Sequence, residues 1–569
     1  MSIIPAATQH RGTSEDAREI SRALRLHPLV ARLLVVRGVT TAEAARGFLS
    51  PRLADLTRPD AMADRELAAE RLASAVKRRQ RVVVFGDYDV DGITSAALLT
   101  RALRQMGGEV SAMVASRFDG GYGLSDAALD RALALRPAVL VTCDCGTSDH
   151  PRLARARAAG VDCVVVDHHK VPDEALPAMA FLNPHRPDCG FPYKHLASVG
   201  LAFSVSAAVR AKLGLALDLR PFLDLVALGT VADVAPLDGD NRILVRAGLQ
   251  RIGDHHAGPG LTALLKETRL RFKPTSRDVG FSIAPLLNAP GRLGAATPTL
   301  ELLLADDPVE AARRAAELST ANARRREISA RLVDEALTQV RRVYGAEVPA
   351  GVVVSGEGWH EGMGGIVAGR LVEQLGAAVA VVAVNDGLGV GSVRAPRGVK
   401  VYDAVRACAE VLEGFGGHDA AAGLRVRAAR VEALRERFAS AVASTGRVAE
   451  VEAPRAEVIL REEDLTPALA KDLLALEPTG EGNPEPVVEV AGARLGELRG
   501  VAEAHLRAGL SVGGRPLAGF IRDGVRLQHE GRLPSVGSRV DVVGALRPDP
   551  WNGDGAVQVE VRAIRATTA

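Results

Sequence analysis

The stretch VVVFGDYDVDGITS, residues 82–95, places three aspartates directly behind an apolar, β-branched run. The run is typical of a buried strand, and Asp87, Asp89 and Asp91 occupy alternate positions just after it. Carboxylates at this density would repel one another and raise their own pKa values unless a cation lay among them. The stretch therefore predicts a strand whose carboxyl end carries a metal site.

Three other apolar runs end in acidic or imidazole side chains. They are AVLVTCDCG at 138–146 with Asp144, VDCVVVDHH at 161–169 with Asp167, His168 and His169, and LVALGTVADV at 225–234 with Asp233. We interpret all of these runs as strands that alternate with alanine-rich helices. Such alternation predicts a doubly wound parallel sheet, in which ligands collect beyond the carboxyl ends of the strands.

The mixture of side chains indicates which metal and which chemistry to expect. Aspartate oxygens with a little imidazole suit Mn²⁺ or Mg²⁺ better than Zn²⁺. Two such cations, about 3.5–4 Å apart, can bind the attacking and leaving oxygens of a phosphoryl displacement. The five cysteines include no C-x-x-C pair, which argues against both a structural zinc site and a disulfide framework.

Simpler interpretations stay open for single motifs. An aspartate after a strand is often the N-cap of the next helix, and this applies to Asp87 or Asp167 taken alone. Gly92 is expected to let the chain turn from the strand into that helix. A second DHH sequence at 254–256 follows LQRIG and precedes AGPG. No predicted strand precedes this copy and directs it to the edge of a sheet, so we interpret it as a surface feature.

The 569 residues predict an α/β protein of several domains. Residues 1–75 form a helical lead-in, 76–300 the first α/β domain, and 301–345 one long helical connector. A second α/β domain at 346–450 contains the glycine-rich turn GFGGHDAAAGL. Short strands at regular spacing over 451–569 predict a small β-barrel.

Composition places the chain among ordinary globular proteins, with 47% hydrophobic, 25% charged and 3% aromatic residues and a net charge of +2. No stretch approaches the roughly 18 uninterrupted apolar residues of a membrane span. The opening MSIIPAATQHRG does not match a secretory signal. We therefore expect a cytoplasmic protein with no membrane partner.

Several motifs in fixed order resemble a known family. GDYDVDG, TCDCG, VVDHH and GTVAD resemble the four motifs of the DHH phosphoesterases, and FGGHDAAAG resembles the signature of their associated C-terminal domain. Within that family, the chain is similar to the RecJ exonucleases through SRFDGGYGL (116–124), LNAPGRLG (287–294), GWHEGMGGIVAGRLVE (358–373), GSVRAP (391–396) and EGNPEP (481–486). The chain departs from the common pattern in EPTG before that last motif and in Ala395 of GSVRAP.

The resemblance implies a DHH catalytic domain that holds two divalent cations, Mn²⁺ or Mg²⁺. By motif matching, the metal ligands are Asp89, Asp91, Asp144, His168 and Asp233. Asp87 and His169 are implied to be accessory catalytic groups, which bind the second cation, orient a water or hold a ligand in place. Asp167 is implied to support His168.

The resemblance also implies the reaction and the partners. Proteins of this kind degrade single-stranded DNA from the 5′ end to the 3′ end, release mononucleotides, and act in DNA recombination and repair. The implied contacts to the 5′-phosphate and backbone are Arg117, Arg292, Ser392, Arg394 and His418. Single-strand-binding protein and a helicase are candidate partners, and a monomer is expected.

Each of these contacts has a simpler alternative. An arginine among so many can be ordinary surface charge, and His418 can be a histidine bonded to a tight turn. The C-terminal barrel fits an OB fold, which binds single strands through basic and aromatic side chains. Candidates there are Phe520, Trp551, Arg507, Arg522 and Arg526.

Two other functions stay open from the sequence. A phosphodiesterase for short RNA or cyclic dinucleotides would share the superfamily, but such chains resemble only the catalytic and associated domains, without 301–345 and 451–569. A catalytically silent, DNA-binding replication scaffold would be expected to have lost metal ligands, and all five are present here.

Overall fold

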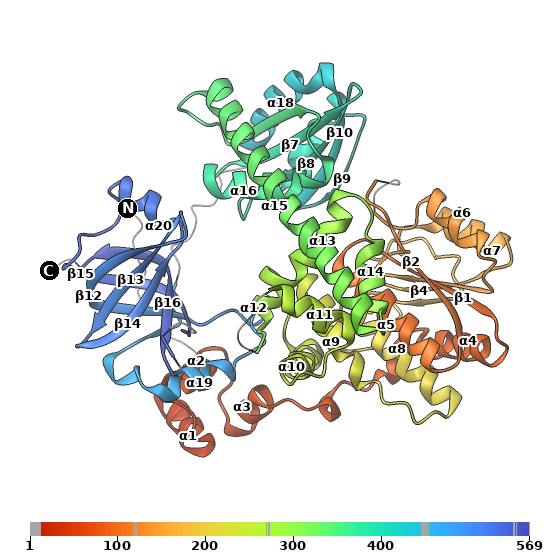
Figure 1. Ribbon diagram of the computed structural model, residues 1–569, viewed down its shortest axis with the longest axis horizontal. Coiled ribbons are helices and arrows are strands. Elements are labelled where there is room, and N and C mark those ends of the chain that lie inside the picture. The colour runs from red at the N-terminus through yellow and green to blue at the C-terminus, as the bar shows by residue number, and fades with distance from the viewer. Residues whose placement is uncertain are drawn as a thin grey trace.

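The computed structural model describes residues 13–118, 122–268, 270, 273–444, 455–549, 552–553 and 555–567. These residues form three sheets with their covering helices, two of five strands and one of six. Figure 1 shows the three bodies, with the blue barrel on one side and the second α/β domain above the first. The predicted α/β multidomain fold is confirmed.

The first α/β domain is built on a parallel sheet in the order β2-β1-β3-β4-β5. Its strands are β1 (Arg81–Gly86), β2 (Glu109–Val114), β3 (Val139–Cys143), β4 (Asp162–Val166) and β5 (Ala180–Leu182). Helices α4 (Arg65–Lys77), α5 (Val90–Gln105) and α8 (Ser198–Leu213) cover one face, and α6 (Asp126–Ala134) and α7 (His150–Ala158) cover the other. Alternation along β1 sends Val82 and Val84 to one core and Val83 and Phe85 to the other. The sheet is therefore doubly wound.

The strand predicted from LVALGTVADV is wrong, because this segment is helix α9 (Leu223–Ala232). Every residue from Leu223 to Thr230 is buried, so the helix is apolar all round and has no polar face to reveal its period. An apolar run of this length is too long for most buried strands. Helix α9 packs against α5, α8 and α10 (Gly239–Gly253).

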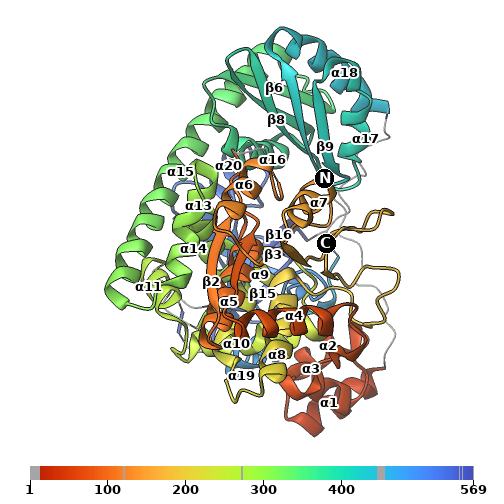
Figure 2. The same ribbon diagram turned by 90° about the vertical axis from the view of Figure 1, so that its right-hand side faces the viewer.

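The predicted continuous helix at 301–345 is interrupted. Helix α14 (Thr297–Leu304) ends before Ala305, and α15 (Pro308–Tyr344) begins after Asp307, whose side chain accepts a hydrogen bond from the Glu310 amide at 2.8 Å. The break follows from this N-cap and from Pro308 in the first turn. The 37 residues of α15 span roughly 55 Å at 1.5 Å per residue. Figure 2 shows α15 along one edge of the molecule, linking the two α/β domains.

Other helices of the first domain lie between α10 and α14. They are α11 (Pro259–Thr268), α12 (Ser276–Asp278), the π-helical turn η4 (Val279–Ile283) and α13 (Ala284–Leu293).

The second α/β domain has a mixed sheet in the order β6-β7-β8-β10-β9. Its strands are β6 (Gly351–Glu357), β7 (Ala378–Asn385), β8 (Leu388–Arg394), β9 (Gly414–His418) and β10 (Ala421–Arg427). Its helices are α16 (Gly364–Leu375), α17 (Val401–Arg406) and α18 (Val431–Ser444). The glycine-rich segment 414–424, predicted as a turn, is mostly the antiparallel β9–β10 hairpin, with the turn confined to 419–420.

The C-terminal region forms a closed barrel, since β12 pairs with both β13 and β15, and β16 pairs with both β14 and β15. Its strands are β11 (Val458–Ile459), β12 (Val487–Val501), β13 (His505–Val512), β14 (Arg515–Ile521), β15 (Arg539–Pro548) and β16 (Val557–Ala566). Helices α19 (Pro467–Leu474) and α20 (Gly524–His529) pack against the barrel. The predicted barrel is confirmed.

The N-terminal helices pack on this barrel. Helices α1 (Ser14–Leu24), α2 (Pro28–Val36) and α3 (Ala42–Leu49) share a hydrophobic core with its strands. Arg32 contacts Asp464 at 2.7 Å, and Arg37 contacts Glu457 at 2.8 Å. The first and last parts of the described chain therefore form one packed unit. Among the described helices, none has the length and apolarity to cross a membrane.

Candidate active site

The carboxyl ends of β1, β3 and β4 place three aspartates side by side. The backbone ladder continues one residue past each strand: the Asp87 amide donates to Cys143 O at 3.1 Å, the Asp144 amide to Val166 O at 2.9 Å, and the Asp167 amide to Leu182 O at 3.0 Å. These strands are neighbours in a parallel sheet, so their ends share one edge. The predicted gathering of aspartates at this edge is therefore present.

The turn after β1 adds Asp89 and Asp91. Asp89 is the N-cap of α5, where its Oδ1 accepts a hydrogen bond from the Gly92 amide at 3.1 Å. Asp91 is buried in the first turn and accepts from the Ser198 and Val199 amides at 2.8 and 3.0 Å. Helix α5 begins before Gly92, and a Cβ at Gly92 would lie 2.5 Å from the Asp87 nitrogen. Gly92 is therefore needed for close packing rather than for the predicted turn.

Asp144 has a backbone conformation that few residues adopt. Its φ is +62°, in the left-handed region, and Gly146 follows at +108°. The Tyr122 hydroxyl donates to the Asp144 carbonyl at 2.9 Å, and the Ser198 hydroxyl donates to its Oδ1 at 3.1 Å. These hydrogen bonds fix both the backbone and the carboxylate of Asp144.

Asp167 supports the two histidines that follow it. Its Oδ1 accepts from the His168 and His169 amides at 2.8 and 3.2 Å and lies 2.7 Å from His169 Nδ1, while its Oδ2 accepts from the Thr147 amide at 3.1 Å. The Tyr122 hydroxyl also lies 3.0 Å from His169 Nδ1. Asp167 thus holds the His168 backbone, as predicted, and it contacts the imidazole of His169 as well.

His168 lies at the centre of the acidic group. Its Nε2 is 3.2 Å from Asp144 Oδ1, 3.7 Å from Asp233 Oδ2 and 4.0 Å from Asp91 Oδ2. This nitrogen is buried and has no hydrogen-bond partner among the described residues. Asp233 reaches the group as the C-cap of α9, although its segment is not a strand.

All seven residues predicted to be catalytic come together here. Ligand atoms lie within 4.8 Å of one another in three overlapping groups, which are Asp91, His168 and Asp233; Asp87, Asp89 and Asp144; and Asp144, His168 and His169. Asp144 belongs to two of the groups. A shared carboxylate, mixed oxygen and nitrogen ligands and the unbonded His168 nitrogen fit a pair of divalent cations. We name these seven residues the metal cluster.

The electrostatics of the metal cluster favour bound cations. Burial, followed by neighbouring carboxylates, raises the pKa of Asp91 to about 7 and of Asp87 and Asp233 to about 8. The same causes raise the pKa of Asp144 well above its ordinary value. Burial, then the charge of His169, lowers the pKa of His168 to about 4, which keeps it a neutral ligand.

The pKa values of Asp167 and His169 are shifted in opposite directions. Burial alone would raise the pKa of Asp167, but its hydrogen bond with His169 and the charge of that residue lower it to about 2. Burial alone would lower the pKa of His169, but Asp167 and the other carboxylates raise it to about 9. Since both groups are charged near neutral pH, they form an ion pair beside the metal cluster.

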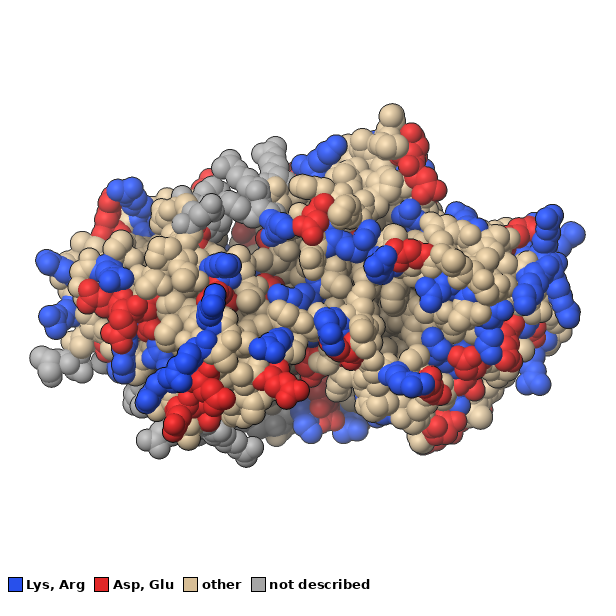
Figure 3. Space-filling view, turned by 90° about the horizontal axis from the view of Figure 1, so that it is seen from below, with Lys and Arg blue, Asp and Glu red and all other residues tan. Residues whose placement is uncertain are grey.

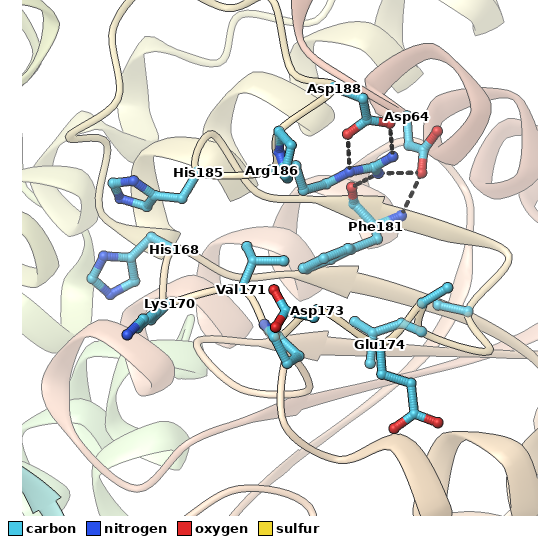
Figure 4. Close-up of a pocket in the computed structure, with 15 residues that line it drawn as sticks. Asp64, His168, Lys170, Val171, Asp173, Glu174, Phe181, His185, Arg186 and Asp188 are labelled. Carbon is cyan, nitrogen blue, oxygen red and sulfur yellow. Dashed lines mark hydrogen bonds and ion pairs between the residues drawn. The ribbon is translucent and has the colours of Figure 1, made fainter.

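A pocket of about 640 Å³ opens beside His168. Figure 4 shows the side chains of His168, Lys170 and His185 at one end of it, and the Arg186 network with Asp64 and Asp188 at the other. Arg186 contacts Asp64 at 2.6 Å and Asp188 at 2.5 Å, so its charge is balanced. The metal cluster is thus open to solvent on this side.

A second cluster lies where the two α/β domains meet. The Arg117 guanidinium stacks 4.2 Å from the Tyr88 ring centroid. Burial, then the charges of Arg117, Arg325 and Arg394, lowers the pKa of Arg292 to about 10. Burial, then Arg117, lowers the pKa of Arg394. The strongest charges on Arg292 are therefore other arginines, and among the described residues no carboxylate forms an ion pair with Arg117, Arg292 or Arg394.

The N-terminus of α16 lies against this arginine cluster. A Cβ on Gly364 would lie 3.2 Å from Ser392 Oγ, and one on Gly365 would lie 3.1 Å from an Arg394 guanidinium nitrogen. The glycines therefore let Ser392 and Arg394 approach the helix start, where backbone amides favour an anion. Arg117, Arg292, Ser392 and Arg394, which the resemblance implies as phosphate contacts, come from distant segments and lie close together here.

His418 is exposed at the end of β9, and its Nδ1 accepts a hydrogen bond from the Ala420 amide at 3.3 Å. It belongs to none of the potential metal-binding groups among the described residues. This contact matches the simpler alternative for His418, a histidine hydrogen-bonded to a tight turn. The second DHH sequence, at 254–256, is exposed, and Asp254 pairs with Lys273 at 2.5 Å.

The arginines predicted for the barrel are already paired. Arg507 contacts buried Asp549 at 2.6 Å, Arg522 contacts Glu560 at 2.9 Å, and Arg526 lies 3.8 Å from Glu530. Trp551 lies outside the described residues, and the Phe520 ring lies 5.4 Å from that of His505. Figure 3 shows basic and acidic side chains interspersed on the lower face of the molecule. Within the described parts of the chain, these barrel arginines are therefore paired, whereas Arg117, Arg292 and Arg394 at the domain junction form no ion pair.

Sequence reasoning missed three contributors to these sites. Tyr122 lies within the quoted SRFDGGYGL motif, but a single tyrosine after glycines carries no chemical pattern of its own. Ser198, the first residue of α8, is the serine of an LAS sequence that matches no motif. Arg325 is one of three consecutive arginines on α15, and only the fold distinguishes the one that approaches Arg292.

Comparisons with known proteins agree along the whole chain. Residues 81–230 match the N-terminal domain of the DHH family, residues 348–444 match the DHHA1 domain, and residues 456–563 match the RecJ OB domain. The single-stranded-DNA-specific exonuclease RecJ of Escherichia coli (strain K12) is 35% identical over 566 residues, which cover 95% of this chain and 96% of that protein.

Solved structures give the same result. The structure of RecJ from Thermus thermophilus with Mn²⁺ has a TM-score of 0.82 and 30% identity, and the match covers 99% of this chain and 80% of that chain. The structure of that RecJ with Mg²⁺ has a TM-score of 0.76 and 29% identity, with coverage of 99% and 79%. The chain described here belongs to the RecJ family, within the DHH phosphoesterases.

Proposed function

We propose that this protein is a metal-dependent exonuclease that degrades single-stranded DNA from the 5′ end and releases mononucleotides. The observation that carries the proposal is the contact between the metal cluster and the arginine cluster. Tyr88 stands between Asp87 and Asp89, and its ring packs against Arg117. A hydrolytic site therefore lies one side chain away from a site for a terminal phosphate, which suits removal of one nucleotide at a time.

The metal cluster supplies the residues that would hold the cations. Asp91, His168 and Asp233 would bind one cation, and Asp87, Asp89 and Asp144 the other, with Asp144 near both. RecJ structures with Mn²⁺ and with Mg²⁺ support this choice of metals. When bound, the cations supply Lewis acidity toward the phosphodiester and lower the pKa of water.

The protein's own side chains prepare the site. Asp167 and Tyr122 hold His169 through its Nδ1, which leaves the Nε2–H group of the charged ring free to donate to a phosphate oxygen or a water. Tyr122 also holds the Asp144 backbone in its left-handed conformation. Both contacts fix the ligands before DNA binds, and such preorganisation lowers the cost of reaching the transition state.

The arginine cluster sets the polarity of the reaction. Arg117, Arg292 and Arg394, with Ser392 and the start of α16, would bind the 5′-terminal phosphate through forked hydrogen bonds. This places the next phosphodiester toward the metal cluster. His418, on the β9–β10 hairpin, is proposed to contact DNA from the second α/β domain.

The wider function follows from the family and from the barrel. We propose that the protein works in DNA recombination and repair in the cytoplasm, as a monomer, and that single-strand-binding protein and a helicase supply its substrate. The barrel would hold the strand beyond the cleavage site. Because Arg507, Arg522 and Arg526 are paired, we expect stacking to contribute more there than charge does.

The chain offers an internal control for a test. His168→Ala removes the central imidazole of the metal cluster, and His255→Ala makes the same change in the exposed second DHH sequence. We expect His168→Ala to lose at least a thousandfold in kcat on 5′-phosphorylated single-stranded DNA with Mn²⁺, while His255→Ala keeps full activity. Equal activity of both variants, with folding verified by circular dichroism, would contradict the proposed site.

A further inference from the structure

Phe281 is an aromatic side chain with an unusual degree of exposure. It is 67% exposed, against 41% for Phe118 and 47% for Tyr122. It lies in the π-helical turn η4, between α12 and α13. Turns of this kind are rare and occur frequently at functional sites. Leaving a phenyl ring in water costs free energy that its burial would recover.

The turn that carries Phe281 packs against the helix that carries Asp233. Turn η4 packs against α9, and a Cβ on Gly280 would lie 4.0 Å from Val231, two residues before Asp233. Val234, directly after that ligand, is 66% exposed and has a φ of +61°. Val234 therefore lies at the end of α9 that carries a predicted metal ligand, and Phe281 lies on a turn that packs against the same helix.

Arg277 connects Phe281 with the barrel. The Arg277 guanidinium lies 4.9 Å from the Phe281 ring centroid and contacts Glu560 at 3.3 Å and Glu485 at 3.6 Å. A cavity of about 380 Å³ follows, lined by Arg277, Val501, Arg507, Phe520, Arg547, Gln558 and Glu560. Figure 1 shows α12, which carries Arg277, on the side of the first domain that faces β16.

We propose that Phe281 is a stacking platform for a base of the single strand between the metal cluster and the barrel. The inference rests on the proposed function, and it assigns the route of the strand: past Val234, over Phe281, and into the cavity that contains Phe520. Every base has a flat π face, so such a platform binds any sequence. Arg277 is placed to orient the ring and to approach a backbone phosphate.

Single-stranded DNA fits this surface better than a protein partner does. Two large apolar side chains are exposed on turn η4 and just after α9, Phe281 and Val234, whereas a protein interface would require a broad apolar patch. Arg277 links the two aromatics, because it contacts the Phe281 ring and also lines the cavity that contains Phe520. Arg507 and Arg547 line the same cavity, and all three arginines contact carboxylates. Spaced aromatics with adjacent cations are the common arrangement for holding single strands.

The test uses the full-length protein and two measurements. Phe281→Ala removes the ring and Phe281→Trp keeps a stacking surface, while Val309→Ala is a control at a residue that is 78% exposed on α15. The first measurement is binding of a fluorescent, 5′-phosphorylated 20-nucleotide strand in chelator. The second, with Mn²⁺, is the ratio of kcat/KM on that strand to kcat/KM on a 5′-phosphorylated dinucleotide, which has only one nucleotide beyond the scissile phosphodiester.

We expect Phe281→Ala to weaken binding and to lower the ratio by roughly tenfold, which is the cost of losing one stacked base. Phe281→Trp and Val309→Ala should stay within twofold of the unchanged protein. Binding and ratio unchanged in Phe281→Ala would overturn the inference. Because binding is measured without cleavage, weakened binding in a protein that cleaves nothing would support the stacking platform while refuting the proposed function.

Discussion

Binding of Mn²⁺ should release protons, and its affinity should rise with pH. Burial and mutual repulsion raise the pKa of Asp91 to about 7 and of Asp87 and Asp233 to about 8. The metal-free cluster therefore holds protons at pH 6 to 7 that a cation must displace. His168 contributes no proton in this range, because its pKa is lowered to about 4.

The size of this pH dependence follows from the linkage between Mn²⁺ binding and proton release. Each displaced proton makes the affinity tenfold higher per pH unit, about 1.4 kcal/mol. All three carboxylates are mostly protonated at pH 6, and a cation held by Asp91 and Asp233 displaces two of these protons, so its affinity should rise roughly fiftyfold between pH 6 and 7 and level off above pH 8. These folded-state pKa values are raised, so the stability they contribute to the metal-free protein is present at low pH and lost as the pH rises through 7 to 8. Mn²⁺ should therefore raise the melting temperature more at pH 8 than at pH 6.

Isothermal titration calorimetry measures both quantities. Titrations of Mn²⁺ at pH 6.5 in two buffers of different ionisation enthalpy give the number of protons released, and titrations at pH 6 and 7 give the slope. An Asp91→Asn variant, which removes one of the protonated carboxylates, should release fewer protons. An affinity that does not depend on pH, with no proton release, would refute the electrostatic account of the metal cluster.

Three other predictions concern the arginine cluster and the tyrosine. Arg292→Lys keeps the charge but loses the planar fork; we expect KM for 5′-phosphorylated strands to rise at least tenfold while KM for 5′-hydroxyl strands changes little, and equal changes for both ends would contradict the phosphate site. Tyr122→Phe removes a hydroxyl that contacts Asp144 and His169; kcat should fall about tenfold with KM within twofold, and an unchanged kcat would contradict its positioning role. The logarithm of DNA affinity in chelator should fall with the logarithm of salt concentration with a slope near −3, as roughly four phosphate contacts require, and Arg325→Ala should make that slope shallower by about 0.7; an unaltered slope would exclude Arg325 from the DNA contacts.

Features carried by short, continuous segments could be predicted from the sequence. Strands β1, β3 and β4 are β-branched apolar runs that end at Asp87, Asp144 and Asp167, so pattern and chemistry coincide within a few residues. Helix α9 was mistaken for a strand because an apolar helix buried all round shows no period. Asp233 was still placed correctly, since either element would deliver it to the same edge.

Features that depend on distant contacts could not be predicted. The pairing of Arg507 with Asp549 joins residues 42 positions apart, and the salt bridge of Arg32 with Asp464 joins residues 432 apart. No local pattern distinguishes a paired arginine from an unpaired one. For the same reason the approach of Arg325 to Arg292, and the exposure of Phe281 beside the end of α9, became visible only in the fold.

The most direct test of the central claim is the polarity of digestion. Single strands of about 30 nucleotides, labelled at an internal position, are given a block at the 5′ end, at the 3′ end or at neither, and are incubated with Mn²⁺ or with excess chelator. We predict mononucleotide release from the strand blocked at the 3′ end, none from the strand blocked at the 5′ end, and none in chelator. Digestion that begins at the 3′ end, or full activity in chelator, would contradict the account.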